Sequence, residues 1–169
     1  KLWSAAPILE FSQKEISRGE KLLADIGLQK DTKFICFGLR ENAYYKSLTA
    51  SLVERTASGE LPITEKIDYS IFEHGPEQEI RNPKLETYIS AFQNPPISSE
   101  VVIRMGSVVG SEIIDAGAKL IDYATKYRSA FGDVFLMSRC EFVIAGGSPG
   151  IHLLATAFNR PAVITDGYY

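Results

Sequence analysis

Short apolar runs alternate with helical patterns along most of this sequence. Residues 11–28 carry apolar side chains at helical spacing, begin with the capping box Ser12-x-x-Glu15 and end at the stop signal Gly27. Residues 33–39 then form a continuous apolar run of strand length. A run without alternation is typical of a strand that is covered on both faces in a parallel sheet. This part of the chain therefore predicts a helix followed by a buried strand.

The second half of the chain repeats the alternation more regularly. Strands are predicted at residues 100–105, 119–123, 141–145 and 161–165, and helices at residues 85–92, 130–140 and 151–158. Strands that alternate with helices at these lengths predict parallel pairing through right-handed crossovers. We therefore expect one α/β domain over residues 1–169, with a Rossmann-like, doubly wound, mostly parallel sheet and helices on both faces.

The segment between these two parts predicts little regular structure. Residues 40–59 are polar and rich in tyrosine, serine and threonine, and residues 61–82, with Pro62, Gly75 and Pro76, indicate an elaborated loop. We also expect the chain to be a fragment. Its first residue is not methionine, and an α/β domain normally continues beyond a strand such as the one predicted at residues 161–165.

Composition is that of a soluble globular domain. The 169 residues are 45% hydrophobic and 23% charged, and no apolar run reaches the roughly 20 residues of a membrane span. The formal net charge of −3 gives no electrostatic reason to expect nucleic acid or an anionic membrane as a partner. Cys36 and Cys140 lie in apolar segments, so we expect two reduced, buried thiols in a cytoplasmic protein.

Ligands of an open parallel sheet bind beyond the carboxyl ends of its strands, and the glycine-rich turn at residues 146–150 is the strongest candidate there. Gly146 and Gly147 permit a tight turn, Ser148 stands at an N-cap position and Pro149 at the first helical position. The amides of that first turn would then bind a phosphate or a carboxylate. The alternative is that Ser148 only caps the helix and the glycines only permit the turn.

Gly150 and His152 complete this candidate site. His152 falls in the first turn of the helix, where it either faces a bound nucleotide or is an ordinary surface histidine. The two histidines and two cysteines of the chain have no metal-site spacing, and nothing nominates a Ser–His–Asp set. We expect no metal and no cofactor.

Arg40 follows the first predicted strand directly and would emerge at the same edge of the sheet. A guanidinium there suits two-pronged binding of phosphate oxygens. The alternative is an exposed arginine paired with Glu41 or another surface carboxylate. Tyr44 and Tyr45 either stack on a base or a sugar or simply pack against their neighbours.

Three more residues are candidates for the same site. Arg104 lies within an apolar strand, so its charge needs a partner or a direction toward solvent. Gly106 either lets a ligand approach the backbone closely or only forms a turn. Asp133, in the helix at residues 130–140, either faces the site or contacts Arg128 or a neighbouring loop.

The order of several short segments adds information that none of them carries alone. They are GLRENAYY at residues 38–45, RMG at 104–106, IDY at 121–123, DVFL at 133–136, GGSPG at 146–150 and TD at 165–166. In this order they resemble an uncharacterised bacterial family of GT-B-type glycosyltransferases for surface carbohydrates. The resemblance covers residues 33–45 and about residues 101–166. It departs at Gly38, where the family commonly has a histidine, so any phosphate-binding or catalytic role of that histidine is missing here.

The resemblance implies that this chain is the donor-binding, C-terminal half of a protein with two facing Rossmann-like domains. Such an enzyme transfers a sugar from a nucleotide-sugar donor to a carbohydrate acceptor without a metal. A more distant similarity to O-fucosyltransferases, whose first-strand arginine binds the donor diphosphate, implies that role for Arg40. The glycine-rich turn would share the diphosphate, with Tyr44, Arg104, Gly106 and Asp133 near the donor. The catalytic base is not identified, and membrane association is expected only through a part of the protein outside this chain.

Other functions fit the same residues. A nucleotide-sugar epimerase or hydrolase on a related fold would release free sugar instead of forming a glycoside. A non-catalytic nucleotide- or carbohydrate-binding module is a different class, which Gly38 favours because of the missing histidine. A purely architectural glycine-rich turn is a third possibility, since a fold does not determine a function.

Overall fold

Five parallel strands form one sheet in the order β3-β2-β1-β4-β5 of the computed structural model. The strands are β1 (Phe34–Leu39), β2 (Val101–Met105), β3 (Leu120–Ile121), β4 (Val143–Gly146) and β5 (Ala162–Thr165). β1 is central, and its Cys36 is in register with Ile103 of β2 and Val143 of β4. Every residue of β1 is buried, as its unbroken apolar run predicts. The predicted α/β class with a parallel sheet is confirmed.

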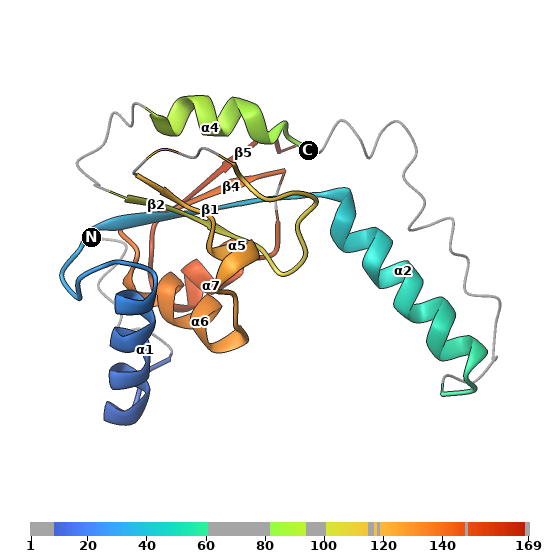
Figure 1. The fold of residues 1–169 in the computed structure, drawn as a ribbon, viewed down its shortest axis with the longest axis horizontal. Coiled ribbons are helices and arrows are strands. Elements are labelled where there is room, and N and C mark those ends of the chain that lie inside the picture. The colour runs from blue at the N-terminus through green and yellow to red at the C-terminus, as the bar shows by residue number, and fades with distance from the viewer. Residues whose placement is uncertain are drawn as a thin grey trace.

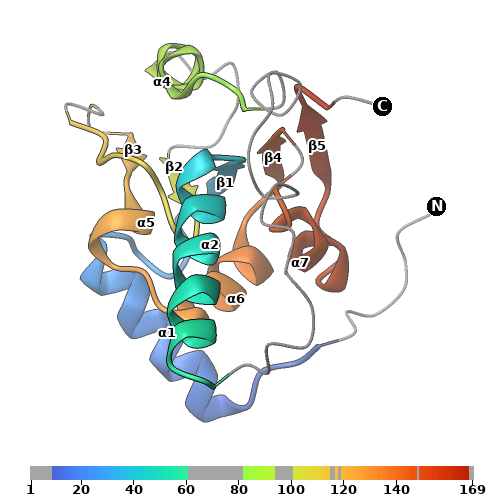
Figure 2. The same cartoon turned by 90° about the vertical axis from the view of Figure 1, so that its right-hand side faces the viewer.

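The structure describes residues 9–60, 82–93, 101–114, 117, 119–147 and 149–167. The loop predicted at residues 61–82 lies outside these ranges except for Asn82, and so does Ser148. The described helices are α1 (Gln13–Asp25), α2 (Asn42–Ala57), α4 (Leu85–Gln93), α5 (Tyr123–Lys126), α6 (Ala130–Arg139) and α7 (His152–Ala157). In Figures 1 and 2, α4 covers one face of the sheet and α1, α5, α6 and α7 lie on the other.

Side chains of β1 alternate between two cores. Phe34 and Cys36 pack with α1 and α6, whereas Ile35, Phe37 and Leu39 pack with α4. This alternation follows from strand geometry, in which successive side chains point to opposite faces. It matters for the site, because the next residue directed to the α6 side is Gly38.

The capping box predicted for the first helix is present. The Ser12 amide donates to Glu15 Oε2 at 2.8 Å, and the Glu15 amide donates to Ser12 Oγ at 3.4 Å. The chain leaves α1 through Gly27, whose φ of 82° is in the left-handed region that glycine favours. Gly19 lies against Phe135 of α6, where an added Cβ would come within 2.1 Å of the ring. This contact packs α1 tightly on α6.

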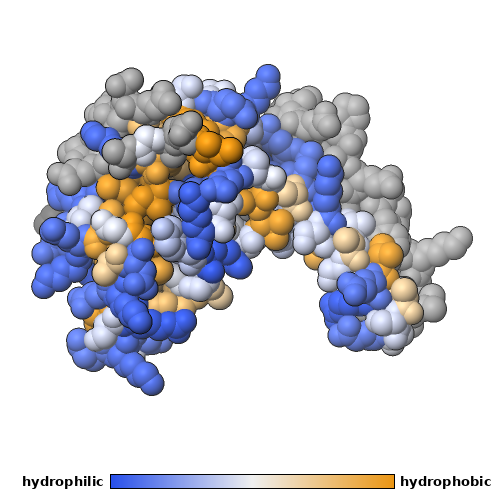
Figure 3. Space-filling view, in the orientation of Figure 1, coloured by the Kyte–Doolittle hydropathy of each residue, from blue (hydrophilic) through white to orange (hydrophobic). Residues whose placement is uncertain are grey.

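Two sequence predictions were wrong. Residues 40–59 predict no element, yet α2 runs through them. α2 has no buried residue and stands away from the sheet and the other helices (Figures 1 and 3), so it lacks the apolar stripe on which helix prediction depends. The strand predicted at residues 119–123 is only two residues long, because Asp122 is the N-cap residue of α5 and Tyr123 opens that helix.

Cys36 and Cys140 are free and buried, as predicted. Cys140 ends α6, and its thiol donates to the Met137 carbonyl at 3.3 Å. None of the described helices combines the length and the apolar character needed to cross a membrane.

Candidate functional site

A pocket of about 430 Å³ opens at the carboxyl ends of β1, β2 and β4. Its lining consists of residues 38–41, 44, 45, 105–108, 133, 149–151 and 154. β1 and β4 are neighbours in the sheet although the chain passes through β2 and β3 between them. After β1 the chain crosses to β2 by way of α4 on one face, and after β4 it crosses to β5 by way of α7 on the other (Figure 2). The pocket therefore lies at the topological switch point, the usual ligand position in open α/β sheets.

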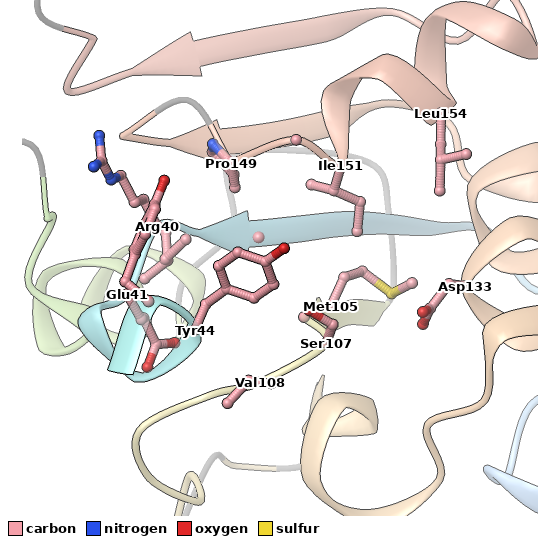
Figure 4. A pocket seen from close by; sticks show the side chains of 15 residues that line it. Arg40, Glu41, Tyr44, Met105, Ser107, Val108, Asp133, Pro149, Ile151 and Leu154 are labelled. Carbon is pink, nitrogen blue, oxygen red and sulfur yellow. The ribbon is translucent and has the colours of Figure 1, made fainter. Parts of the chain in front are cut away.

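The middle of the pocket is apolar. Gly38 and Met105 lie at the ends of β1 and β2, and Ile151 approaches them from the turn before α7 (Figure 4). A Cβ added at Gly38 would lie 2.9 Å from Ile151 Cγ2. Glycine at this position thus allows Ile151 to approach the strand and leaves space beside it.

Arg40 and Tyr44 lie at one end of the pocket (Figure 4). The Arg40 Cζ atom is 4.9 Å from the centroid of the Tyr45 ring, a cation–π distance. Tyr44 is 45% exposed and directs its ring toward the middle of the pocket. At this end the Tyr44 ring is accessible, and the Arg40 guanidinium is directed away from the middle of the pocket (Figure 4).

Glu41 connects this end of the pocket to the loop after β2. Its Oε1 accepts from Arg104 Nη2 at 2.7 Å, and its Oε2 accepts from the Gly110 amide at 2.6 Å. Both carboxylate oxygens of Glu41 are therefore engaged by groups other than Arg40. Glu41 thereby holds the loop that includes Ser107 and Val108, two further residues of the lining.

Asp133 lies at the opposite end of the pocket, in the first turn of α6 (Figure 4). Its Oδ2 accepts from Arg128 Nη2 at 3.0 Å and from Arg128 Nε at 3.2 Å, so the predicted contact with Arg128 is present. The buried Oδ1 accepts no hydrogen bond from the described part of the chain. Burial raises the pKa of Asp133, and the charge of Arg128 and the nearby Tyr123 hydroxyl oppose this rise.

Arg104 is directed away from the pocket. It follows Ile103 and precedes Met105, both of which belong to the core on the α6 side, so its own side chain points to the other face of β2. There it is 1% exposed and bonds the Ser111 carbonyl at 2.6 Å and Asp122 Oδ2 at 3.4 Å, in addition to Glu41. The predicted need for a partner is met within the fold, and Arg104 does not line the pocket.

Gly146 and Gly147 belong to the sheet. Gly146 is the last residue of β4, and the Gly147 amide donates to the Thr165 carbonyl at 2.9 Å. A Cβ on Gly146 would lie 2.6 Å from the Tyr88 hydroxyl and 2.7 Å from Leu39 Cδ2, on the α4 side. Gly146 therefore makes close packing possible on the α4 side of the sheet, and Gly147 extends the backbone pairing with β5.

The turn before α7 differs from the expected cap. The sequence predicts Pro149 at the first helical position, but α7 begins at His152 and its N-cap residue is Ile151. The first bonds of the turn are of the i to i+3 type, with the Leu153 amide donating to the Gly150 carbonyl at 3.1 Å. His152 Nδ1 lies 2.5 Å from the Pro149 carbonyl, and His152 is not part of the lining.

The structure brings together about half of the predicted site residues. Those that line the pocket are Arg40, Tyr44, Gly106, Asp133 and Gly150. Those outside its lining are Arg104, Gly146, Gly147 and His152. Sequence analysis missed the contributions of Glu41, Met105, Ile151 and Leu154, and it noted Gly38 only as a departure from a family pattern. The useful signal was alternation along β1 and β2, which assigns Gly38 and Met105 to one face.

Within the described ranges, no group of three or more His, Cys, Asp or Glu side chains is arranged to hold a metal ion. Comparison of the chain with family models, with curated proteins and with solved structures finds no match.

Proposed function

We propose that this chain binds a nucleotide-sugar through its diphosphate and is the donor-binding domain of a metal-independent glycosyltransferase. The position of the pocket carries the proposal, since the carboxyl ends of β1 and β4 meet at the switch point of the sheet. The resemblance of the ordered sequence segments to GT-B-type enzymes supports the same interpretation.

The charges around the pocket favour an anionic ligand. Two carboxylates contribute to the lining, but Glu41 is bonded to Arg104 and Asp133 to Arg128. Their negative charges are therefore compensated by arginines. Arg40 is the basic residue among the described residues of the lining, and its guanidinium suits phosphate oxygens.

The proposed reaction displaces a nucleoside phosphate by an acceptor hydroxyl. Negative charge develops on the departing phosphate, and Arg40 would stabilise that charge. Loss of one well-placed donor of this kind typically lowers a rate by about 10²–10³. Tyr44 has an accessible ring, which would stack on the base or on a sugar.

Calorimetric titration with GDP, UDP, TDP and CMP, and with their sugar conjugates, tests the proposal. We expect at least one diphosphate to bind, and Arg40→Ala to weaken it by about tenfold to a hundredfold, as for loss of a charge-assisted hydrogen bond. Arg55→Ala is the matched control, because Arg55 is an exposed arginine near the end of α2 that pairs with Glu60 and does not line the pocket. Absence of binding at millimolar ligand, or equal affinity of Arg40→Ala and wild type, would contradict the proposal.

A non-catalytic binding module is a second candidate, favoured by one observation. The middle of the pocket contains Gly38, Met105 and Ile151, none of which can transfer a proton. Product analysis with a nucleotide-sugar that binds distinguishes the cases: a glycoside indicates transfer, free sugar indicates hydrolysis, and unchanged donor indicates binding alone.

A further inference from the structure

Asp133 is a polar side chain in an apolar part of the pocket. It lies at the end opposite Arg40 and Tyr44, with Leu154 on the same side of the pocket and Met105 and Ile151 toward the middle (Figure 4). The Asp133 side chain is 16% exposed, and its Oδ1 atom is buried at the edge of the pocket. A ligand that reaches from Arg40 toward Leu154 therefore meets apolar side chains and one carboxylate.

The carboxylate of Asp133 has hydrogen-bonding capacity that the described residues do not use. Both bonds from Arg128 go to Oδ2, and Oδ1 accepts none from the described ranges. A carboxylate can accept about four hydrogen bonds. Because the χ2 torsion of aspartate is broad, the carboxylate can turn toward a ligand without movement of α6.

The pairing with Arg128 determines which kind of donor suits this carboxylate. Since Arg128 already compensates its charge, a cationic ligand group is not required. A neutral hydroxyl can supply the missing hydrogen-bond donor. A sugar ring offers such hydroxyls together with C–H groups that pack on Met105 and Leu154.

We propose that Asp133 is a sugar-binding residue, which accepts a hydrogen bond from a hydroxyl of the ribose or of the transferred sugar. This inference rests on the proposed nucleotide-sugar function and adds a second contact point to it. Arg40 binds the phosphate end of the ligand, and Asp133 binds a hydroxyl at the other end of the pocket.

The variant Asp133→Asn is the most direct change. Arg128 provides only donors, so it keeps the amide oxygen, and the amide nitrogen replaces Oδ1. The substitution thus exchanges an acceptor for a donor with little change in volume. Arg139→Gln is the matched control, because Arg139 is exposed, belongs to the same helix and does not line the pocket.

Each variant is titrated with four ligands: inorganic pyrophosphate, UDP, 2′,3′-dideoxyuridine diphosphate and UDP-glucose, with the guanosine and mannose equivalents in parallel. We expect Asp133→Asn to weaken the hydroxyl-bearing ligands by about tenfold, the loss typical of one hydrogen bond to a charged group, and to leave pyrophosphate unchanged. If Asp133→Asn has a lower affinity for UDP but not for its dideoxy analogue, the ribose is the group that bonds Asp133. If its affinity is lower for UDP-glucose alone, the transferred sugar is that group.

Two negative results have different meanings. If wild type binds none of the nucleotides, the proposed function fails and this inference fails with it. If wild type binds them and Asp133→Asn has equal affinity for all, only the role of Asp133 is overturned. Unchanged pyrophosphate binding also shows that the variant is folded, and a uniform loss over all four ligands would assign Asp133 a structural role instead.

Discussion

At the carboxyl edge of the sheet, the charged side chains on its two faces differ in how many partners they have. On the α4 side, Arg104 is 1% exposed and bonds Glu41, Asp122 and the Ser111 carbonyl. On the α6 side, Asp133 is bonded through one oxygen to Arg128 and lies at the pocket. Arg104 is enclosed by its partners, whereas Asp133 lines the pocket and has a buried oxygen, Oδ1, that accepts no hydrogen bond from the described residues. The difference separates a charge that is bonded within the fold from one that we propose contacts a ligand.

Glycines show the same contrast. Gly146 and Gly38 each end or nearly end a strand, and each lies close to a bulky neighbour. The missing side chain of Gly146 makes room for Tyr88 and Leu39 in the closed core, while that of Gly38 leaves space in the pocket. One glycine is therefore expected to matter for stability and the other for binding.

Arg104→Met should produce the largest effect. It leaves the buried carboxylate of Asp122 and the half-buried carboxylate of Glu41 without their cation, so we expect a loss of about 3–5 kcal/mol in the free energy of unfolding. Urea unfolding measures this loss. Arg128→Gln, which removes the more exposed ion pair with Asp133, should cost no more than about 1 kcal/mol. Similar losses in the free energy of unfolding for the two variants would contradict the proposed difference between the two faces.

Gly146→Ala and Gly38→Ala should separate stability from binding. An alanine Cβ at Gly146 meets Tyr88, Leu39 and Pro83, so we expect a destabilisation of about 1–3 kcal/mol with little change in ligand affinity. At Gly38 the neighbour at 2.9 Å is the end of the Ile151 side chain, which can move, so the stability cost should be smaller. The added methyl group enters the pocket and should lower nucleotide affinity by about tenfold. Thermal unfolding and calorimetry of both variants measure the two quantities, and the opposite assignment would refute the comparison.

Tyr88 gives the smallest effect and one that depends on pH. Its hydroxyl bonds Thr165 and Asp166, and burial together with the Asp166 carboxylate raises its pKa from 10.0 to about 12. The folded state therefore favours the neutral phenol. Its contribution to stability is fully present below pH 10 and is lost as pH rises from 10 to about 12. Urea unfolding between pH 9 and pH 12 should show a steeper decline for wild type than for Tyr88→Phe, and parallel curves would exclude this role.

The sequence predicts much of the fold because local signals are strong. The unbroken apolar run of β1, the capping box at Ser12 and Glu15 and the stop at Gly27 all appear in the structure as expected. α2 was missed because a helix that buries no residue has no apolar stripe to detect. The helix predicted at residues 151–158 is present as α7, but Pro149 is not its first residue, since glycine and proline signals indicate a turn without setting the first helical residue.

The candidate site was predicted less completely than the fold. Arg40, directly after β1, and Asp133, in the first turn of α6, were named from the sequence, and both line the pocket. Arg104 was named with them because a charge within an apolar strand needs a partner or a direction toward solvent. A strand that is buried on both faces has no polar alternation, so its sequence shows which side chains share a face but not which of the two faces borders the pocket.

By itself, the sequence determined that this protein has a buried central strand, an α/β alternation and charged residues near strand ends. Only the tertiary structure decided that Arg104 and Met105, neighbours in the chain, serve opposite faces, and that Met105 meets Gly38 and Asp133 at one pocket. The physical reason is that an apolar run in the sequence predicts burial, whereas strand order and the surroundings of each side chain depend on how the strands pair. The different surroundings of Arg104 and Asp133 are therefore set by the assembled sheet.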